Sequence, residues 1–355
     1  MEKKEDHIEL HVQKMSPLTQ EHLLGHESVE KNLRRLIDEN KLPHALLITG
    51  PSGIGKATLG FRLSRFLCIY GIKEEQEKIE PDSLYVASTH PLFRRFVQHS
   101  FGDFLCVPEE GNTSEIGIDA IRNLIHFLHQ TPREGTIRCV LIEDAHLMNR
   151  NAANALLKIL EAPPSHVFLI LVTSKENLML PTILSRVHKI RLSPLDSTKT
   201  REILHRNLET ASEEEVNFLE EFSEGSPGFG ENVFLLGGKA FYNQLCAFFE
   251  GCVLRSKEQH LPFDLIHTFL EKHKNEHLSC DFIYGFILKS LSIFLDLHRK
   301  KSFFQKEIDF SMSYEARLAL WSRAQHILME ALTFDLDLKQ VLSSLFLEIY
   351  EAFSA

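Results

Sequence analysis

The residues best suited to chemistry form a glycine-rich stretch, Gly50-Pro51-Ser52-Gly53-Ile54-Gly55-Lys56-Ala57. An apolar run, residues 45–49, precedes this stretch, and a helical pattern over residues 59–68 follows it. A glycine-rich loop between a strand and a helix turns successive backbone N–H groups toward an anion, and the helix N-terminus adds partial positive charge. The stretch therefore predicts a P-loop that binds the phosphates of ATP or ADP. Its candidate ligands are Gly50, Gly53, Gly55 and Lys56.

One position of this loop departs from the P-loop pattern. A serine or threonine normally follows the lysine, because its hydroxyl holds the magnesium ion that accompanies the nucleotide. This chain has Ala57 at that position. Thr58 is one step further along a helix, which turns its side chain by about 100°, so we expect it to point away from the metal. The loop is predicted to hold phosphate, with or without magnesium, but to support hydrolysis poorly.

A pair of acids follows a second apolar run. Residues 137–142 predict a buried parallel strand, and Glu143 and Asp144 come directly after it. In P-loop nucleotidases a carboxylate at a strand end holds the metal, and in one large class a glutamate beside it activates water. In this chain Glu143 stands at the position of the metal-binding carboxylate, and Asp144 at the position of the glutamate that activates water. The longer and the shorter side chain are therefore exchanged. Because a displacement of order 1 Å can cost about a hundredfold in rate, the exchange also predicts weak hydrolysis.

Two further side chains are candidates for the same chemistry. Thr173 ends a third apolar run, residues 167–172, where its hydroxyl could sense the terminal phosphate. A turn residue at a strand end is the alternative interpretation of Thr173. Arg186 lies in Ser185-Arg186-Val187, after a short predicted helix. A lone arginine is typical of an exposed surface, so its meaning depends on its position in the fold.

The elements that position these residues alternate between strand and helix patterns, which predicts an α/β fold with a parallel sheet. Residues 1–20 are polar and expected to be flexible, and the P-loop core is expected over residues 21–195. Beyond Pro194 only helical patterns remain. They predict a small helical lid over residues 196–238 and an all-α C-terminal domain over residues 239–355. The predicted strands are residues 45–49, 104–107, 137–142, 167–172 and 188–192, and residues 84–86 could begin another. The C-terminal helices are expected near residues 239–257, 262–275, 278–300, 313–333 and 337–353.

Composition excludes several other classes of protein. The chain has 355 residues, enough for two or three domains, and a net charge of −10, which argues against a strongly basic nucleic-acid binder. Its six cysteines are scattered, which is typical of reduced thiols in a cytoplasmic protein. No apolar run approaches the length of a membrane span, and no apolar segment follows the charged residues 1–6 as in a secretory signal. We therefore expect neither a membrane partner nor a secreted protein.

Three motifs together resemble one family. They are Leu42-Pro43-His44-Ala45 before the P-loop, Asn-Ala-Leu-Leu-Lys-Ile-Leu-Glu-Ala-Pro-Pro over residues 154–164, and Ser185-Arg186-Val187. The chain resembles the AAA+ subunits of DNA polymerase clamp loaders, most closely those of the bacterial DNA polymerase III delta-prime type. The resemblance implies an AAA+ core, a helical lid and a C-terminal collar that holds a pentamer. It also implies gamma/tau and delta subunits, a sliding clamp and primer–template DNA as partners of the assembly.

The resemblance gives Arg186 a role. The family has a Ser-Arg-Cys motif at this position, with Val187 replacing the cysteine here. In the family this arginine reaches the ATP of the neighbouring subunit as an arginine finger, which stabilises charge on the transferring phosphoryl group. The motor subunits keep a threonine, an Asp-Glu pair and a lid arginine, where this chain has Ala57, Glu143-Asp144 and Phe229. The chain is thus expected to act in trans without hydrolysing ATP itself.

Other interpretations remain open at this point. An active ATPase motor of the gamma/tau type is favoured by Lys56 and the two acids, and opposed by Ala57 and Phe229. A scaffold unrelated to replication could keep the P-loop as a structural turn. Most bacterial relatives carry four close cysteines after the P-loop helix. This chain offers only Cys68 and Cys106 there, so we expect no zinc site and name no residue as a metal ligand.

Overall fold

The computed structural model describes residues 16–71, 82–108, 115–253, 280–297, 312–334 and 336–354. Most of the expected flexible N-terminus and the helix expected over residues 262–275 lie outside the described residues. The chain divides into two compact units, Met1–Glu231 and Asn232–Ala355.

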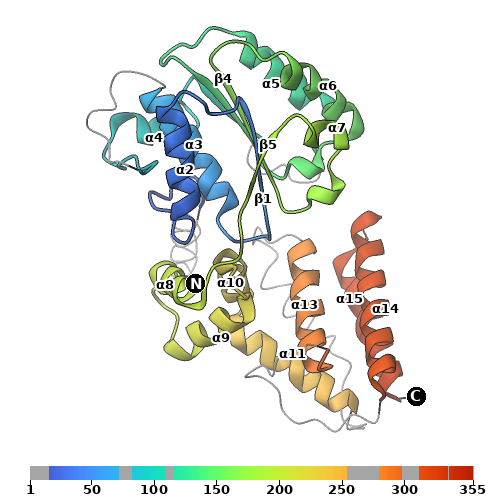
Figure 1. Ribbon diagram of the computed structural model, residues 1–355. Coiled ribbons are helices and arrows are strands. Elements are labelled where there is room, and N and C mark those ends of the chain that lie inside the picture. Colours follow the sequence, from blue (N-terminus) through green and yellow to red (C-terminus); the bar gives the residue numbers. More distant parts are fainter. Residues whose placement is uncertain are drawn as a thin grey trace. The chain divides into compact units, whose positions relative to one another are not determined.

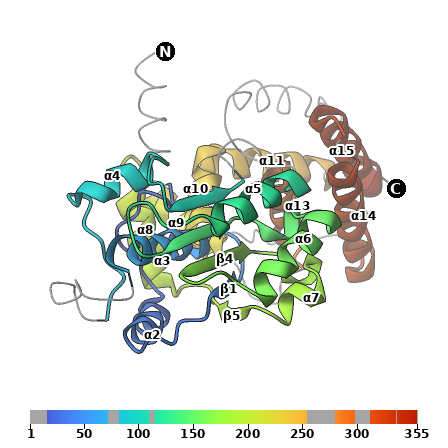
Figure 2. The same ribbon diagram turned by 90° about the horizontal axis from the view of Figure 1, so that it is seen from above.

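The first unit is built on a sheet of five parallel strands in the order β2-β3-β4-β1-β5. Figure 2 shows β1, β4 and β5 side by side, as their pairing requires. The strands are β1 (Ala45–Thr49), β2 (Phe104–Val107), β3 (Arg138–Ile142), β4 (Val167–Thr173) and β5 (His188–Arg191). Every residue of β1, β3 and β4 is buried, as expected for central parallel strands. The predicted α/β core with a parallel sheet is confirmed.

Helices cover both faces of this sheet (Figure 1). Successive strand residues point to opposite faces, so Leu46 and Ile48 pack in one hydrophobic cluster while Ala45 and Leu47 pack in the other. The first cluster includes residues of α2 (Glu27–Asp38), α3 (Lys56–Tyr70) and α4 (Pro91–Val97). The second includes residues of α5 (Ile118–His129), α6 (Arg150–Glu161) and α7 (Pro181–Leu184). This packing fixes the strand ends and the loops that follow them.

The sequence did not predict two features of this region. Residues 84–86 form no strand, because the Leu84 N–H donates to the Glu30 carboxylate instead of to a neighbouring strand. Leu84 and Val86 are nevertheless buried, which explains their apolar pattern. Helix α4 was also missed. It begins at Pro91, a favoured first helical residue, and His90 caps it by accepting the Leu92 N–H.

Three helices follow the sheet: α8 (Ser197–Asn207), α9 (Glu213–Ser223) and α10 (Pro227–Leu235). All three lie within residues 196–238, where the sequence predicted helices, but the start of α10 was not expected, since Gly225-Ser226-Pro227-Gly228 is typical of a turn. Helix α10 instead begins at Pro227, and the boundary between the two units falls within it. Glycines in its first turn hide the helical pattern in the sequence. One of these glycines is needed because the helix begins against the P-loop.

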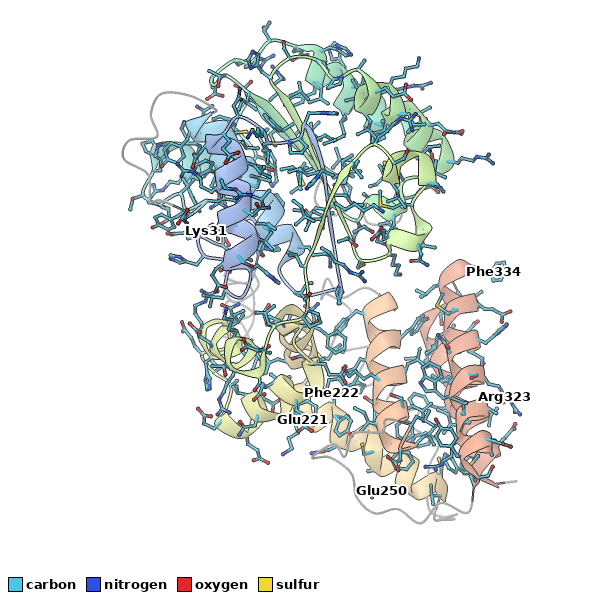
Figure 3. The ribbon with its side chains drawn as sticks, in the orientation of Figure 1. Lys31, Glu221, Phe222, Glu250, Arg323 and Phe334 are labelled. Carbon is cyan, nitrogen blue, oxygen red and sulfur yellow. The ribbon has the colours of Figure 1, made fainter. Side chains whose placement is uncertain are left out.

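The second unit is helical in all its described parts. It contains α11 (Gly238–Val253), α13 (Cys280–Phe294), α14 (Tyr314–Thr333) and α15 (Leu338–Ser354). Aromatic residues form its core, as the pairs Phe241–Phe286 and Phe249–Phe294 show with ring centroids 5.5 and 5.1 Å apart. Phe334, just beyond α14, instead lies 68% exposed (Figure 3). Within the described residues, no helix has both the length and the apolar character that crossing a membrane requires.

Candidate functional site

The P-loop joins β1 to α3 with a backbone that only glycine adopts easily. Gly50, Gly53 and Gly55 have φ angles of +147°, +77° and +97°, and Gly55 caps the N-terminus of α3. A Cβ at Gly50 would lie 2.5 Å from the carbonyl oxygen of Leu192. The three glycines therefore allow the loop to fold closely over the strand ends and to lead into the first turn of α3.

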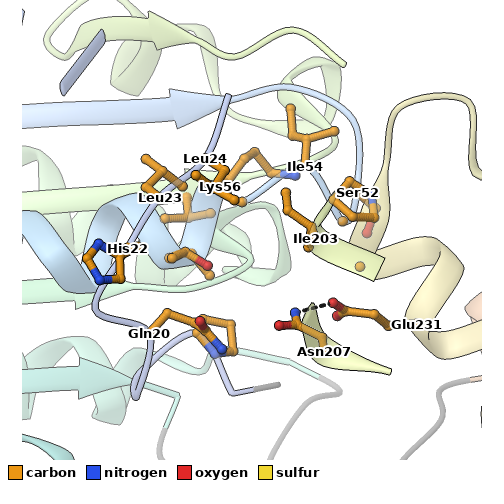
Figure 4. A pocket seen from close by; sticks show the side chains of 18 of the residues that line it. Gln20, His22, Leu23, Leu24, Ser52, Ile54, Lys56, Ile203, Asn207 and Glu231 are labelled. Atoms are coloured by element: carbon orange, nitrogen blue, oxygen red, sulfur yellow. Dashed lines mark hydrogen bonds between the residues drawn. The ribbon is translucent and has the colours of Figure 1, made fainter. Parts of the chain in front are cut away.

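One cavity of about 260 Å³ opens beside this loop (Figure 4). The P-loop, the residues after β3, the segment before α2, and helices α8 and α10 all contribute to its wall. Of the predicted site residues, the structure brings together Gly53, Gly55, Lys56, Ala57, Glu143 and Asp144 around this cavity. Gly50, Thr173 and Arg186 do not line it. The loop and the acid pair, predicted from separate parts of the sequence, thus belong to one site.

Lys56 lies inside the loop. Lys56 is 7% exposed, and its Nζ donates a hydrogen bond to the backbone carbonyl of Pro51. Burial lowers the pKa of Lys56 to about 8, and the negative charge of Asp144 opposes this shift. The ammonium is therefore still mostly protonated at neutral pH and can bind a phosphate oxygen.

The acid pair follows a sharp turn at the end of β3. Glu143 Oε1 accepts a hydrogen bond from the Cys106 thiol at 3.5 Å. Asp144 has a φ of +42°, in the left-handed region that aspartate tolerates better than most residues, and its side chain is largely exposed. Both carboxylates line the cavity and could face a bound cation there.

This loop provides an incomplete set of ligands for a magnesium ion. Ala57 lines the cavity with a methyl group where the P-loop pattern has a hydroxyl. Thr58, which we expected to point away, also contributes to the cavity wall. Glu143 and Asp144 are the carboxylates that could hold the ion. The residues thus fit a phosphate group well and a magnesium ion less well.

Thr173 is engaged at the end of β4 and not in the cavity. Its side chain is fully buried, and its Oγ1 lies 3.1 Å from His146 Nδ1. The same oxygen accepts the Lys175 N–H at 3.1 Å. These contacts are those of the strand-end turn residue that was the alternative interpretation of Thr173.

Several polar residues of the cavity were missed from the sequence, among them an acid and an amide that bind each other. Glu231 of α10 is 8% exposed, and its Oε1 accepts a hydrogen bond from Asn207 Nδ2 of α8 at 2.5 Å (Figure 4). Burial raises the pKa of Glu231 to about 7, although the Asn207 hydrogen bond favours the charged form. The signal that could have found Glu231 is a single charged residue among the apolar residues of 227–235. Leu23, Leu24 and Ile203 add an apolar part to the same wall.

Helix α10 begins directly against the P-loop. The Gly228 N–H donates to the Gly53 carbonyl at 2.9 Å, and a Cβ at Gly53 would lie 2.5 Å from the Phe229 amide nitrogen. The Phe229 ring is stacked on Phe222, with centroids 6.1 Å apart. The position expected to carry a lid arginine thus contributes an aromatic ring to the packing between α9 and α10.

Arg186 lies two residues after α7 and outside the cavity. Its guanidinium is exposed and has three contacts: Nη2 with Glu161 Oε1 at 2.7 Å, and Nη1 with the Thr182 carbonyl at 3.0 Å and with Ser185 Oγ at 3.2 Å. The structure therefore separates Arg186 from the phosphate loop of its own chain.

Cysteine residues of the core are free thiols. Cys68, Cys106 and Cys139 are all buried, and burial raises the pKa of the Cys68 thiol. Within the described ranges, no group of three or more His, Cys, Asp or Glu side chains is arranged to hold a metal ion.

A five-stranded parallel sheet with a glycine loop after β1 and acids after β3 defines a P-loop core of the nucleotide-binding type. Residues 25–196 match the family model described as "DNA polymerase III, delta subunit". This part of the chain is similar to that family.

Curated relatives that match the chain are also subunits of DNA polymerase III. DNA polymerase III subunit delta' of Pseudomonas aeruginosa is 35% identical over 189 residues, covering 52% of this chain and 53% of the relative. The delta' subunit of Escherichia coli is 32% identical over 187 residues, covering 52% of each. The tau/gamma subunit of Haemophilus influenzae is 28% identical over 194 residues, covering 52% of this chain and 25% of the relative. The chain spans about half or less of the length of these relatives.

Proposed function

We propose that this chain is a clamp-loader subunit of a bacterial DNA polymerase III holoenzyme, of the delta-prime type. It helps to load the sliding clamp on primed DNA, hydrolyses little or no ATP in its own site, and supplies Arg186 to the ATP site of a neighbouring subunit. The observation that carries this proposal is the separation of two features: a P-loop cavity with Ala57 at the magnesium position, and an exposed arginine outside that cavity.

The cavity supports binding of a nucleotide without efficient hydrolysis. The backbone of the loop and Lys56 could hold the phosphates of ATP or ADP. When bound, magnesium would neutralise charge on the phosphates, and Glu143 and Asp144 are the residues that would hold it. The missing hydroxyl at Ala57 and the exchanged lengths of the two acids both weaken this arrangement. A P-loop enzyme depends on positioning and electrostatic stabilisation, so both defects lower the rate.

Arg186 has the properties that an arginine finger requires. It carries a permanent charge, it is exposed, and it lies beyond α7, outside its own cavity. A guanidinium can bind two phosphate oxygens at once and stabilise the charge that develops during phosphoryl transfer. Its role would not depend on nucleotide in its own chain.

The partners follow from the same proposal. They are the gamma/tau and delta subunits, the sliding clamp, and primer–template DNA through the assembly, in the cytoplasm. Residues 196–238 would form the lid and residues 239–355 the collar. Exposed apolar side chains on and beside α14 support a role of the second unit in assembly, since such side chains often mark interfaces. They are Tyr314, Leu318, Met329 and Phe334.

An active motor of the gamma/tau type is a second candidate, because Lys56, Thr58 and both acids surround one cavity. The two candidates are separated by Lys56→Ala in an assembly reconstituted with gamma/tau, delta, clamp and primed DNA. We expect clamp loading to stay close to the wild-type rate. A strong loss of clamp loading, with the assembly intact, would favour the motor instead.

A further inference from the structure

Glu161 forms an ion pair with Arg186, the residue that the proposed function places at the ATP site of a neighbouring subunit. We propose that Glu161 is a positioning residue that orients Arg186 for a phosphate group on the neighbouring subunit. This inference rests on the proposed role of Arg186. The contact that suggests it is the 2.7 Å ion pair between Glu161 Oε1 and Arg186 Nη2.

The place of Glu161 in its helix is not explained by helix stability. Glu161 is the last residue of α6, which ends before Pro163 and Pro164. The C-terminus of a helix carries partial negative charge, so a carboxylate there is unfavourable, whereas Lys158 in the same turn is favourable. Asn149 caps the other end by accepting the Ala152 N–H. The negative charge of Glu161 is therefore compensated by Arg186, which lies outside the helix.

Three acceptors together fix the guanidinium. Besides Glu161, the Thr182 carbonyl and Ser185 Oγ accept hydrogen bonds from Nη1 at 3.0 and 3.2 Å. Ser185 Oγ is itself held, because it donates to the same Thr182 carbonyl at 3.1 Å. A guanidinium has five N–H groups, and these three contacts leave two of them for an outside acceptor. The guanidinium is thus held by its own chain, with donors remaining for a phosphate.

The rigid parts of the core support this arrangement. Glu161 stands on α6, whose residues Leu156, Ile159 and Leu160 are buried in the second hydrophobic cluster, together with Ile183 of α7. Pro181 fixes the first turn of α7, and the Arg186 N–H donates to the Ile183 carbonyl at 2.9 Å. Catalytic groups held by rigid elements lose less orientation when they engage their target.

The ion pair contributes little to folding. The Arg186 and Glu161 side chains are 36% and 54% exposed, and exposed pairs add little to stability because solvent screens them. Glu161→Gln should leave the melting temperature unchanged and act only on the reaction at the neighbouring site. Gln keeps the shape of the side chain and removes its charge, so the guanidinium becomes less firmly oriented.

The test measures ATP turnover of the reconstituted assembly with clamp and primed DNA, for Glu161→Gln, Arg186→Ala and the double variant. We expect Glu161→Gln to lower kcat by about tenfold, with KM for ATP unchanged, which is less than the roughly hundredfold cost of a 1 Å displacement. It should have no further effect in the Arg186→Ala background, because both changes act through the same guanidinium. The matched control is Glu213→Gln, which removes a similarly exposed ion pair with Arg201 on the lid.

Each outcome decides between separate claims. If Arg186→Ala lowers turnover while Glu161→Gln matches the wild type, the positioning role is wrong and the proposed function stands. If Glu161→Gln raises turnover, Glu161 restrains Arg186 and the proposal is also wrong. If Arg186→Ala has no effect, the trans role in the proposed function fails, and the role of Glu161 fails with it.

Discussion

Gly53 at the tip of the P-loop and Gly228 at the start of α10 are joined backbone to backbone, by an N–H···O hydrogen bond of 2.9 Å. A Cβ on Gly228 would lie 3.1 Å from both the Cα and the carbonyl oxygen of Gly53. Gly53 has no room for a side chain, and at Gly228 a Cβ would fit only if Gly53 moved by a few tenths of an ångström. The glycine in the first turn of α10, which hid this helix in the sequence, is what allows the helix to lie against the phosphate loop.

Gly53→Ala should therefore destabilise the first unit. The new Cβ would meet the Phe229 amide nitrogen at 2.5 Å, and the backbone would carry an unfavourable φ of +77°. We expect a loss of about 1–3 kcal/mol in the free energy of unfolding, measured by urea denaturation. Gly117→Ala is the matched control, because it meets no atom within 4 Å and caps α5 at a normal φ. Equal effects of the two substitutions would contradict the close contact.

Glu231→Gln should change how stability depends on pH. Burial raises the pKa of Glu231 to about 7 from the usual value of 4.5. A raised carboxyl pKa means that the folded chain keeps its proton longer than the unfolded chain, so stability is lost as pH rises from the unfolded value through about 7. Gln has no carboxyl group that ionises, so the variant does not lose stability in this way. The variant should gain relative to the wild type between about pH 5 and pH 8, by roughly 3 kcal/mol at most.

The measurement for Glu231 is urea unfolding of both proteins across this pH range. Glu202→Gln, at an exposed position on α8, is the control and should show no such trend. A stability difference for Glu231→Gln that is constant with pH would show that its carboxyl is not held neutral by burial.

Asp103→Ala should be among the most damaging single changes in the core. The buried carboxylate accepts N–H bonds at 2.7–2.9 Å from the backbone of residues 133–135, and lies 3.7 Å from Arg138 Nη2. Burial raises the pKa of Asp103, but these N–H donors and Arg138 together lower it below its usual range. The stabilisation is therefore present at neutral pH and is lost only as pH falls through the folded pKa.

Removing this carboxylate leaves Arg138 buried without its charge partner. We expect a cost of about 3–5 kcal/mol in urea unfolding at neutral pH. Asp119→Ala, which removes an exposed pair with Arg122, should cost less than about 1 kcal/mol. Similar costs for the two variants would refute a structural role for the Asp103 network.

Nucleotide binding by the isolated chain should depend little on magnesium, because Ala57 provides no hydroxyl for the ion. Calorimetric titration with ADP, with and without magnesium, measures this directly. Lys56→Ala should weaken binding by removing the charge that meets the phosphates, and Ala57→Thr should introduce a dependence on magnesium. A gain of tenfold or more from magnesium in the wild-type chain would argue for an intact metal site.

The sequence predicted the sheet well because buried parallel strands are short, continuous apolar runs. Residues 45–49 and 104–107 match β1 and β2 at both ends. The sequence also predicted that the glycine loop and the Glu143-Asp144 pair share a site, since the strand ends of a parallel sheet meet at one edge.

Long-range contacts could not be predicted in the same way. Leu84 and Val86 have the pattern of a strand, but the Glu30 carboxylate binds the Leu84 N–H that a strand would need. Glu231 faces the cavity only because α10 begins against Gly53. The Leu84 contact has no local signal, because its partner lies far away in the chain, and Glu231 is marked only as a single charged residue among apolar ones.

The central claim is that this chain serves the ATP site of a neighbour and not its own. The most direct test compares steady-state ATP turnover of the reconstituted assembly carrying Arg186→Ala with the same assembly carrying Lys56→Ala. We expect Arg186→Ala to reduce turnover at the neighbouring site by up to about 10³, as loss of an arginine finger does, and Lys56→Ala to leave turnover near the wild-type value. Loss of turnover with Lys56→Ala, and normal turnover with Arg186→Ala, would contradict the account.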